Sequence, residues 1–127
     1  EAIAQAVKDV SPSLVLYGLA GSELTKAGEK LGLTVAHEVF ADRTYQPDGT
    51  LTPRTEANAL ITDEQQSLDQ IRQMVMEGTV RAVDGTIVEL QADTICVHGD
   101  SPHAVTFASR IYDDLRKSGV NVQPFIP

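Results

Sequence analysis

The feature that most restricts the fold is a repeated order of elements, in which an apolar run is followed by polar residues and then by a helical pattern. The apolar runs predict buried strands near residues 13–17, 34–40 and 94–98, because strands covered on both faces are continuous in Val, Ile and Leu. Repeated strand-helix units favour parallel strands that are joined by right-handed crossovers. The sequence therefore predicts an α/β fold with a parallel sheet.

Signals for helix ends support this order. Ser22 has the place of an N-cap, and Gly32 follows the same helix as its C-terminal glycine. Thr62 and Gln65 have capping-box spacing before a helix that ends at Gly78. The first residues also predict a helix, with an apolar face made of Ile3, Ala6, Val7 and Val10. The last predicted helix is capped by Asp100 or Ser101, has Pro102 in its first turn, presents Ala104, Phe107, Ala108, Ile111 and Leu115, and ends at Gly119.

Two alternating runs, residues 79–83 and 86–90, predict an antiparallel hairpin outside the parallel sheet. Asp84-Gly85 joins them and suits a type I′ turn. Three parallel strands cannot close a barrel, so the chain is either a small open sheet or part of a larger (β/α) barrel. At 127 residues we expect one domain over 1–127.

Charge and cysteine content narrow the class of protein. The chain has 18 acidic and 10 basic side chains, a net charge of −8, which repels phosphate backbones and anionic lipid. We therefore expect no nucleic-acid partner and no membrane partner. Cys96 is the single cysteine in the sequence, and the sequence shows neither a signal peptide nor an apolar run of membrane-spanning length. These features predict a cytoplasmic location.

Polar side chains gather where the predicted strands end, the edge of a parallel sheet at which ligands bind. Alternation along an extended segment places Glu38 and Asp42 on one face, and His98 and Asp100 on one face with Thr94 and Cys96. Ile95 and Val97 then face the helices. The candidate residues are Ser22 after the first strand, Glu38, Asp42 and Arg43 at the second, and His98 and Asp100 at the third.

Each candidate also has a purely structural interpretation. Asp100 suits a helix N-cap, His98 an ordinary hydrogen-bonded histidine, and Cys96 a small packing residue. Glu38, Asp42 and Arg43 suit a surface salt-bridge group. His37 and His103 belong to no motif and are interpreted as surface or structural residues.

Two longer motifs are more specific than these spacings. "EVFADRTYQPDGTLTPR" at residues 38–54 and "TICVHGDSPHAV" at residues 94–105 resemble the LamB/YcsF family. The similarity runs from "LVLYGLAGSEL" to "LRKSG" and covers only the C-terminal part of the family's chain. The family's N-terminal motifs, rich in Asp, Asn and His, have no counterpart here. The resemblance implies the C-terminal half of a (β/α) barrel like that of the polysaccharide deacetylases.

The resemblance also implies an activity. Members of the family act as the A subunit of ATP-dependent 5-oxoprolinase, which opens 5-oxo-L-proline to L-glutamate together with B and C subunits. ATP is then a co-substrate of the complex, and this segment alone is expected to be inactive. No phosphate-binding Walker A pattern occurs in the chain. On the matched motifs, Glu38 or Asp42 is a base or metal ligand, His98 an acid/base and Asp100 its orienter, while Arg43 or Arg54 clamps a carboxylate or phosphate.

Two other functions stay open at this point. One is a metal-dependent deacetylase or amidase-type hydrolase that uses Glu38, His98 and Asp100, which leaves a divalent metal as a candidate cofactor. The other is a non-catalytic scaffold whose acidic surface binds partner subunits.

Overall fold

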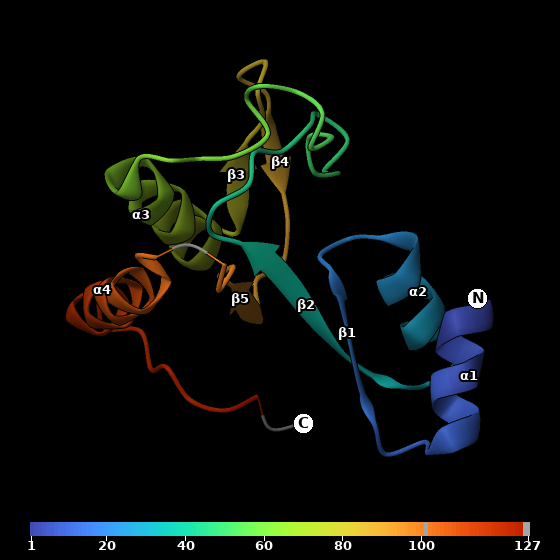
Figure 1. Ribbon diagram of the computed structural model, residues 1–127. Helices are drawn as coiled ribbons and strands as arrows, with labels where there is room; N and C mark the ends of the chain where they lie inside the picture. Colours follow the sequence, from blue (N-terminus) through green and yellow to red (C-terminus); the bar gives the residue numbers. More distant parts are fainter. Residues whose placement is uncertain (101, 126–127) are drawn as a thin grey trace.

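The computed structural model describes residues 1–100 and 102–125, and its elements follow the predicted order (Figure 1). The elements are α1 (Ala2–Val10), β1 (Val15–Leu19), α2 (Glu23–Lys30), β2 (Thr34–Phe40), α3 (Glu64–Arg72), the π-helical turn η1 (Gln73–Glu77), β3 (Thr79–Arg81), β4 (Ile87–Glu89), β5 (Thr94–Cys96) and α4 (Ala104–Lys117).

The strands β1, β2 and β5 form a parallel sheet with β2 between the other two. In the register, Leu19 of β1 lies opposite Glu38, and Phe40 of β2 lies opposite Cys96 of β5. The predicted parallel arrangement is therefore confirmed. The ends differ slightly, because β1 begins at Val15 and β5 stops at Cys96.

Helix α2 covers one face of the sheet, and α1 lies beside α2 (Figure 1). The contact is close because Gly28 of α2 has no side chain. A Cβ atom at this position would lie 2.7 Å from Leu16 Cδ2 and 2.8 Å from Val35 Cγ2. Leu16 and Val35 thus mark the face of the sheet that the helices cover.

A second and larger apolar cluster joins the carboxyl end of β2 to α3, α4 and the β3–β4 hairpin. Its buried members include Val39, Ile71, Met74, Val80 and Ile111. Ile95 and Val97 pack against this cluster, as alternation predicted. Cys96 and His98 consequently face the opposite side of the sheet.

The N-terminal helix forms, but of its predicted buried face only Val7 packs against the core. Ile3 and Val10 are 65% and 78% exposed, whereas Ala4 is fully buried. The side of α1 that meets α2 carries Ala4 and Val7, and Lys8 Nζ donates to the Leu31 carbonyl oxygen at 2.7 Å. Packing against α2, rather than the size of the apolar side chains, therefore determines which face of α1 is buried.

Two predicted N-caps are also corrected. Asp63, not Thr62, caps α3 and accepts a hydrogen bond from the Gln66 amide at 2.7 Å. Helix α4 begins at Ala104, with His103 as N-cap residue and no side-chain cap, so Asp100 does not cap it and Pro102 lies before its first turn. The alternative cap, Ser101, lies outside the described residues. The Ser22 cap of α2 is confirmed, as are the glycines after three helices, Gly32, Gly78 and Gly119, each with positive φ.

The predicted hairpin is present, with β3 and β4 antiparallel, but its turn is not type I′. Gly85 has a φ of 92° while Asp84 does not have a positive φ. The Gly85 amide donates to the Ala82 carbonyl oxygen and the Thr86 amide donates to Asp84 Oδ1, both at 2.9 Å. A longer loop with one left-handed glycine replaces the tight two-residue turn.

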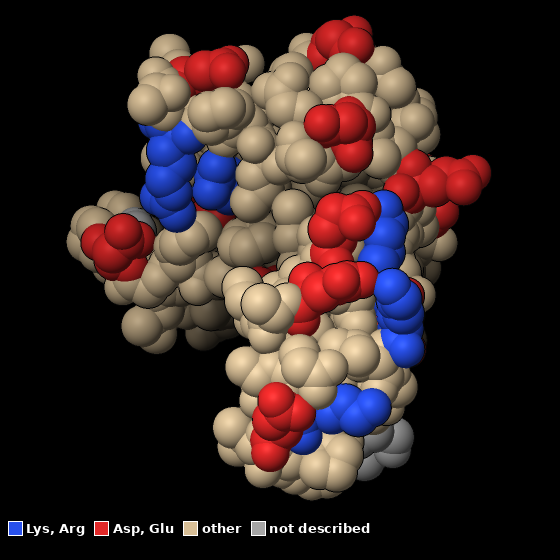
Figure 2. All heavy atoms as spheres, turned by 90° about the vertical axis from the view of Figure 1, so that its right-hand side faces the viewer, with Lys and Arg blue, Asp and Glu red and all other residues tan. Residues whose placement is uncertain are grey.

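The surface agrees with the acidic composition without being uniformly acidic. On the face shown in Figure 2, basic side chains lie close to acidic ones, and ion pairs such as Lys26–Glu23 and Lys30–Glu1 occur on α2 and between α2 and the N-terminus. Within residues 1–100 and 102–125, no helix has the length and apolar character needed to cross a membrane.

Candidate functional site

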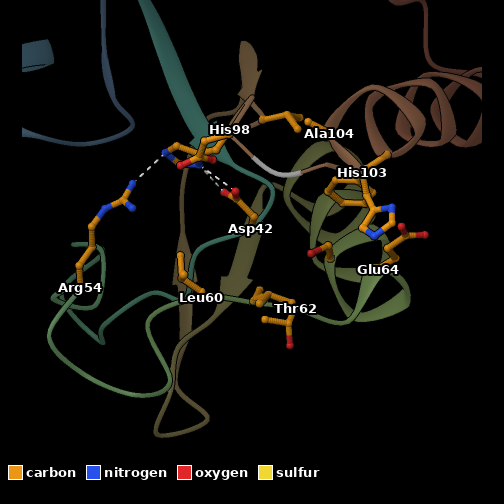
Figure 3. A pocket seen from close by; sticks show the side chains of 13 residues that line it. Asp42, Arg54, Leu60, Thr62, Glu64, His98, His103 and Ala104 are labelled. Carbon is orange, nitrogen blue, oxygen red and sulfur yellow. Dashed lines mark hydrogen bonds and ion pairs between the residues drawn. The ribbon is translucent and has the colours of Figure 1, made fainter.

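The candidate site lies just beyond the paired ends of β2 and β5. The ladder continues past the strands, because the Ala41 amide donates to the Cys96 carbonyl oxygen at 3.1 Å. Phe40 lies opposite Cys96, so the next residues on the same face, Asp42 and His98, come side by side. Their side chains meet, with His98 Nδ1 2.8 Å from Asp42 Oδ2 and 2.9 Å from Oδ1 (Figure 3).

The other ring nitrogen of His98 contacts an arginine. Arg54 Nη2 lies 3.0 Å from His98 Nε2 (Figure 3). A guanidinium group only donates hydrogen bonds, so Nε2 accepts and carries no proton. The imidazole is therefore neutral, with its proton on Nδ1 and donated to Asp42. Both contacts select the same tautomer, and they form a line of cation, neutral ring and carboxylate.

The imidazole is also held by packing. The Phe40 ring stacks on the His98 ring with centroids 6.0 Å apart and an interplanar angle of 27°. The side chains of His98 and Asp42 are 28% and 21% exposed. Charges in this partly buried environment are screened less by water and salt than charges on an open surface. The ring is thus fixed on one face and at both nitrogens.

Arg43, predicted as an anion clamp, is instead a structural anchor. It is buried, with 6% exposure, and its guanidinium donates to two backbone carbonyl oxygens, that of Thr52 at 2.6 Å and that of Ala59 at 3.2 Å. These two residues are the ends of the loop that carries Arg54. The prediction failed because the chain leaves the sheet after Asp42, which strand alternation does not show. The Arg43 side chain is therefore buried against the loop.

A pocket of about 300 Å³ opens beside the Asp42–His98–Arg54 line. Its walls come from the ends of β2 and β5, from the loop that carries Arg54, from the segment before α3 and the first turn of α3, and from the start of α4. Four predicted site residues line it, namely Asp42, Arg54, His98 and Asp100. The remaining lining residues include Thr62, Glu64, Ser67, His103 and Phe107.

Asp100 lines the pocket but does not hold His98 in the predicted way. The chain turns at Gly99 and Asp100, so it does not continue as a strand past His98. The alternation that placed Asp100 beside the ring therefore fails, and the carboxylate at Nδ1 belongs to Asp42.

Glu38 and Ser22 do not line the pocket. Glu38 lies opposite Thr94, further back along β2 than Asp42. Burial raises the pKa of the Cys96 thiol, and the charges of Glu38 and Asp42 add to this effect. A thiolate is thus disfavoured, which supports packing as the role of Cys96. Ser22 Oγ accepts from the Thr25 amide at 3.4 Å and caps α2.

Sequence reasoning missed several pocket residues. Thr62, Glu64 and Ser67 come from an irregular loop and the helix after it, where no periodic pattern points to a cavity. His103 could have been found, since it closely follows the same strand end as His98. Among residues 1–100 and 102–125, no three His, Cys, Asp or Glu side chains are grouped so that they could hold a metal ion.

Comparisons with known proteins identify the family of the chain. The LamB/YcsF family model matches residues 1–127. The 5-oxoprolinase A subunit of Halalkalibacterium halodurans is 63% identical over 96% of this chain and 48% of that protein. The protein of the same name from Bacillus subtilis (strain 168) is 54% identical over 96% of this chain and 48% of that protein.

The crystal structure of a lactam utilization protein from Thermus thermophilus has the same fold. The TM-score is 0.87 at 39% sequence identity, over 98% of this chain and 49% of that chain. The chain thus spans about half the length of the relatives that it matches. The family match over residues 1–127, the identity to these relatives and the shared parallel α/β fold show that the chain belongs to the LamB/YcsF family.

Proposed function

We propose that this chain is the C-terminal part of a 5-oxoprolinase A subunit, and that its pocket takes part in the hydrolytic opening of 5-oxo-L-proline to L-glutamate. The observation that supports this most is the Asp42–His98–Arg54 line at the carboxyl ends of parallel strands. An acid/base group and a cation side by side suit a substrate that has both an amide to hydrolyse and a carboxylate to bind. The names of the relatives, which refer to 5-oxoprolinase and to lactam utilization, favour this substrate class.

In the proposed reaction, ATP activates the lactam. A lactam carbonyl is a poor electrophile, and phosphorylation of its oxygen creates a good leaving group. His98 Nε2 takes a proton from the attacking water, and the ring C–N bond of the adduct breaks as the nitrogen receives a proton. A second water then hydrolyses the acyl phosphate that is left, which releases phosphate and gives the carboxylate of L-glutamate. Asp42 keeps the Nδ1 proton in place and stabilises the imidazolium that forms. Arg54 pairs with the substrate carboxylate or the phosphate.

The other predicted residues have supporting roles in this proposal. Asp100 is a second carboxylate at the pocket wall, Arg43 positions the Arg54 loop, and Ser22 maintains α2. Glu38 does not line the pocket, so His98 rather than Glu38 is the base in this proposal.

We further propose that the complete protein is a (β/α) barrel of the polysaccharide-deacetylase kind, with this chain as one half, and that it works with B and C subunits. The parallel strand-helix units and the half-length match to relatives support the barrel. The relatives' name, which designates one subunit among several, supports a complex. We assign ATP binding to the complex. We assign any divalent metal to residues beyond this chain. The 127-residue chain alone is expected to be inactive.

The test is glutamate release by the full-length protein reconstituted with B and C subunits and ATP. His98→Ala should lower kcat by about 10²–10⁴-fold if His98 is the acid/base. Folded concentrations are matched by circular dichroism, so that a stability defect does not count as lost activity. Near-normal turnover by His98→Ala would assign His98 a structural role. Metal analysis of the same preparation tests the metal-dependent alternative.

A further inference from the structure

The contact between Arg54 and His98 occupies the nitrogen that the proposed reaction needs. A general base acts through a free lone pair, and here the Nε2 lone pair accepts a hydrogen bond from Arg54 Nη2 at 3.0 Å. Nδ1 cannot replace it, because it carries the proton that it donates to Asp42. In this arrangement His98 is oriented but not available as a base.

We propose that Arg54 masks His98 until an oxyanion in the pocket draws the guanidinium away. This inference rests on the proposed function. It adds that the carboxylate of the substrate, besides being bound, exposes the Nε2 lone pair. After Arg54 has moved, a water molecule gives its proton to Nε2, and its oxygen forms the new bond to the activated carbonyl carbon.

The structure of the loop at residues 52–59 allows the Arg54 side chain to move in this way. The ends of the loop are fixed, because Arg43 donates to the Thr52 and Ala59 carbonyl oxygens and Thr44 Oγ1 donates to the Asn58 carbonyl oxygen at 2.8 Å. Arg54 itself is exposed. A long side chain on a fixed backbone can change rotamer while its Cα stays in place.

The charges favour an incoming anion over the histidine. Within residues 1–100 and 102–125, no carboxylate forms an ion pair with Arg54, and its acceptor is a neutral imidazole. The Arg54–His98 hydrogen bond has one charged partner, whereas a bidentate pair with a carboxylate has two charged partners and two parallel hydrogen bonds that match the fork of the guanidinium. A carboxylate or a phosphate oxyanion can therefore displace the histidine as the partner of Arg54.

The proposal predicts that a lactam without a carboxylate is a poor substrate even when it fits the pocket. In the reconstituted complex, 2-pyrrolidinone should turn over slowly, and added acetate should increase its turnover. The Arg54 guanidinium is exposed, so water screens its hydrogen bond to the value of an ordinary one, which masks the nitrogen by about 3- to 10-fold, and the increase should be of this size. Arg54→Ala should raise 2-pyrrolidinone turnover by a similar factor, remove the acetate effect and lower kcat/KM for 5-oxo-L-proline.

A clamp without masking gives a different pattern. Arg54→Ala would then lower kcat/KM for 5-oxo-L-proline, leave 2-pyrrolidinone turnover unchanged and show no acetate effect in either protein. That pattern would overturn the proposal. Arg81→Ala, an exposed arginine on the β3–β4 hairpin, is the matched control and should behave as wild type with both lactams.

A second measurement does not depend on turnover. In the full-length protein with ¹⁵N-labelled histidine, the Nε2 resonance of His98 should move toward that of an imidazole without a donor when 5-oxo-L-proline is added, and 2-pyrrolidinone should have no such effect. Inorganic phosphate, added separately, shows whether a phosphate oxyanion also releases Arg54. In Arg54→Ala the resonance should begin at the released position and not respond.

The two proposals can fail separately. An anion-dependent shift in a protein that does not open 5-oxo-L-proline would support masking and contradict the proposed reaction. Turnover that requires His98 without any change at Nε2 on binding would support the reaction and overturn masking.

Discussion

Replacement of Arg43 by methionine tests whether the loop beside the pocket depends on a buried cation. Arg43→Met keeps most of the apolar volume and removes both hydrogen bonds of the guanidinium. The Thr52 carbonyl oxygen then loses the hydrogen bond from Nη2. The Ala59 carbonyl oxygen keeps a donor, because the Thr44 amide also bonds to it at 3.1 Å. The two losses are therefore unequal.

The expected cost follows from this inequality. A hydrogen bond from a charged donor, lost so that a buried acceptor is left unpaired, costs about 1.5–3 kcal/mol, and the second bond about 1 kcal/mol. Methionine avoids the desolvation of a buried cation, which offsets part of the loss. We expect the free energy of unfolding to fall by about 3 kcal/mol, which in a protein of the relatives' length lowers Tm by about 6–12 °C.

The assay is urea unfolding of the full-length protein, followed by circular dichroism, with Arg81→Met as control. Arg81 is exposed, so its replacement should change the free energy of unfolding by less than about 0.5 kcal/mol. If Arg43→Met unfolds as late as this control, the hydrogen bonds of Arg43 do not stabilise the loop, and the argument for a fixed Arg54 backbone fails with them.

Three further outcomes are expected. Asp42→Asn should lower kcat by about 10²–10⁴-fold at matched folded concentration, because the amide cannot stabilise an imidazolium; activity equal to that of Asp113→Asn, an exposed control on α4, would contradict this. Burial raises the pKa of Tyr45 from 10.0 to about 12, so the unfolded phenol loses its proton first and the free energy of unfolding should fall by about 2–3 kcal/mol as pH rises between these values. Urea titrations in which Tyr45→Phe falls as steeply over this range would show that Tyr45 is not the cause. Gly28→Ala should destabilise the protein by about 1–3 kcal/mol despite its better helix propensity, because the new Cβ would lie 2.7 Å from Leu16; a higher Tm would refute the close contact.

Local signals in the sequence were enough for most of the fold. Continuous apolar runs, separated by helical patterns, determined the parallel strands β1, β2 and β5, since such segments need cover on both faces. Glycines at Gly32, Gly78 and Gly119 ended helices because the backbone there has positive φ. These effects act within a few residues of the sequence and can be predicted without knowing which other segments pack nearby. The contact face of α1 could not be read in this way, because α2 selected it.

The same distinction between local signals and tertiary contacts applies to the candidate site. Its position, with His98 and Asp42 at strand ends, followed from the sequence because parallel strands bring their carboxyl ends to one edge. The pairing within the site did not. It depends on the register that places Phe40 opposite Cys96, on the turn that carries Asp100 away from the ring, and on a loop that brings Arg54 to His98 across 44 positions of sequence. Register and loop closure are set by packing between distant segments, so only the tertiary structure decided which carboxylate orients the histidine and which cation covers its free nitrogen.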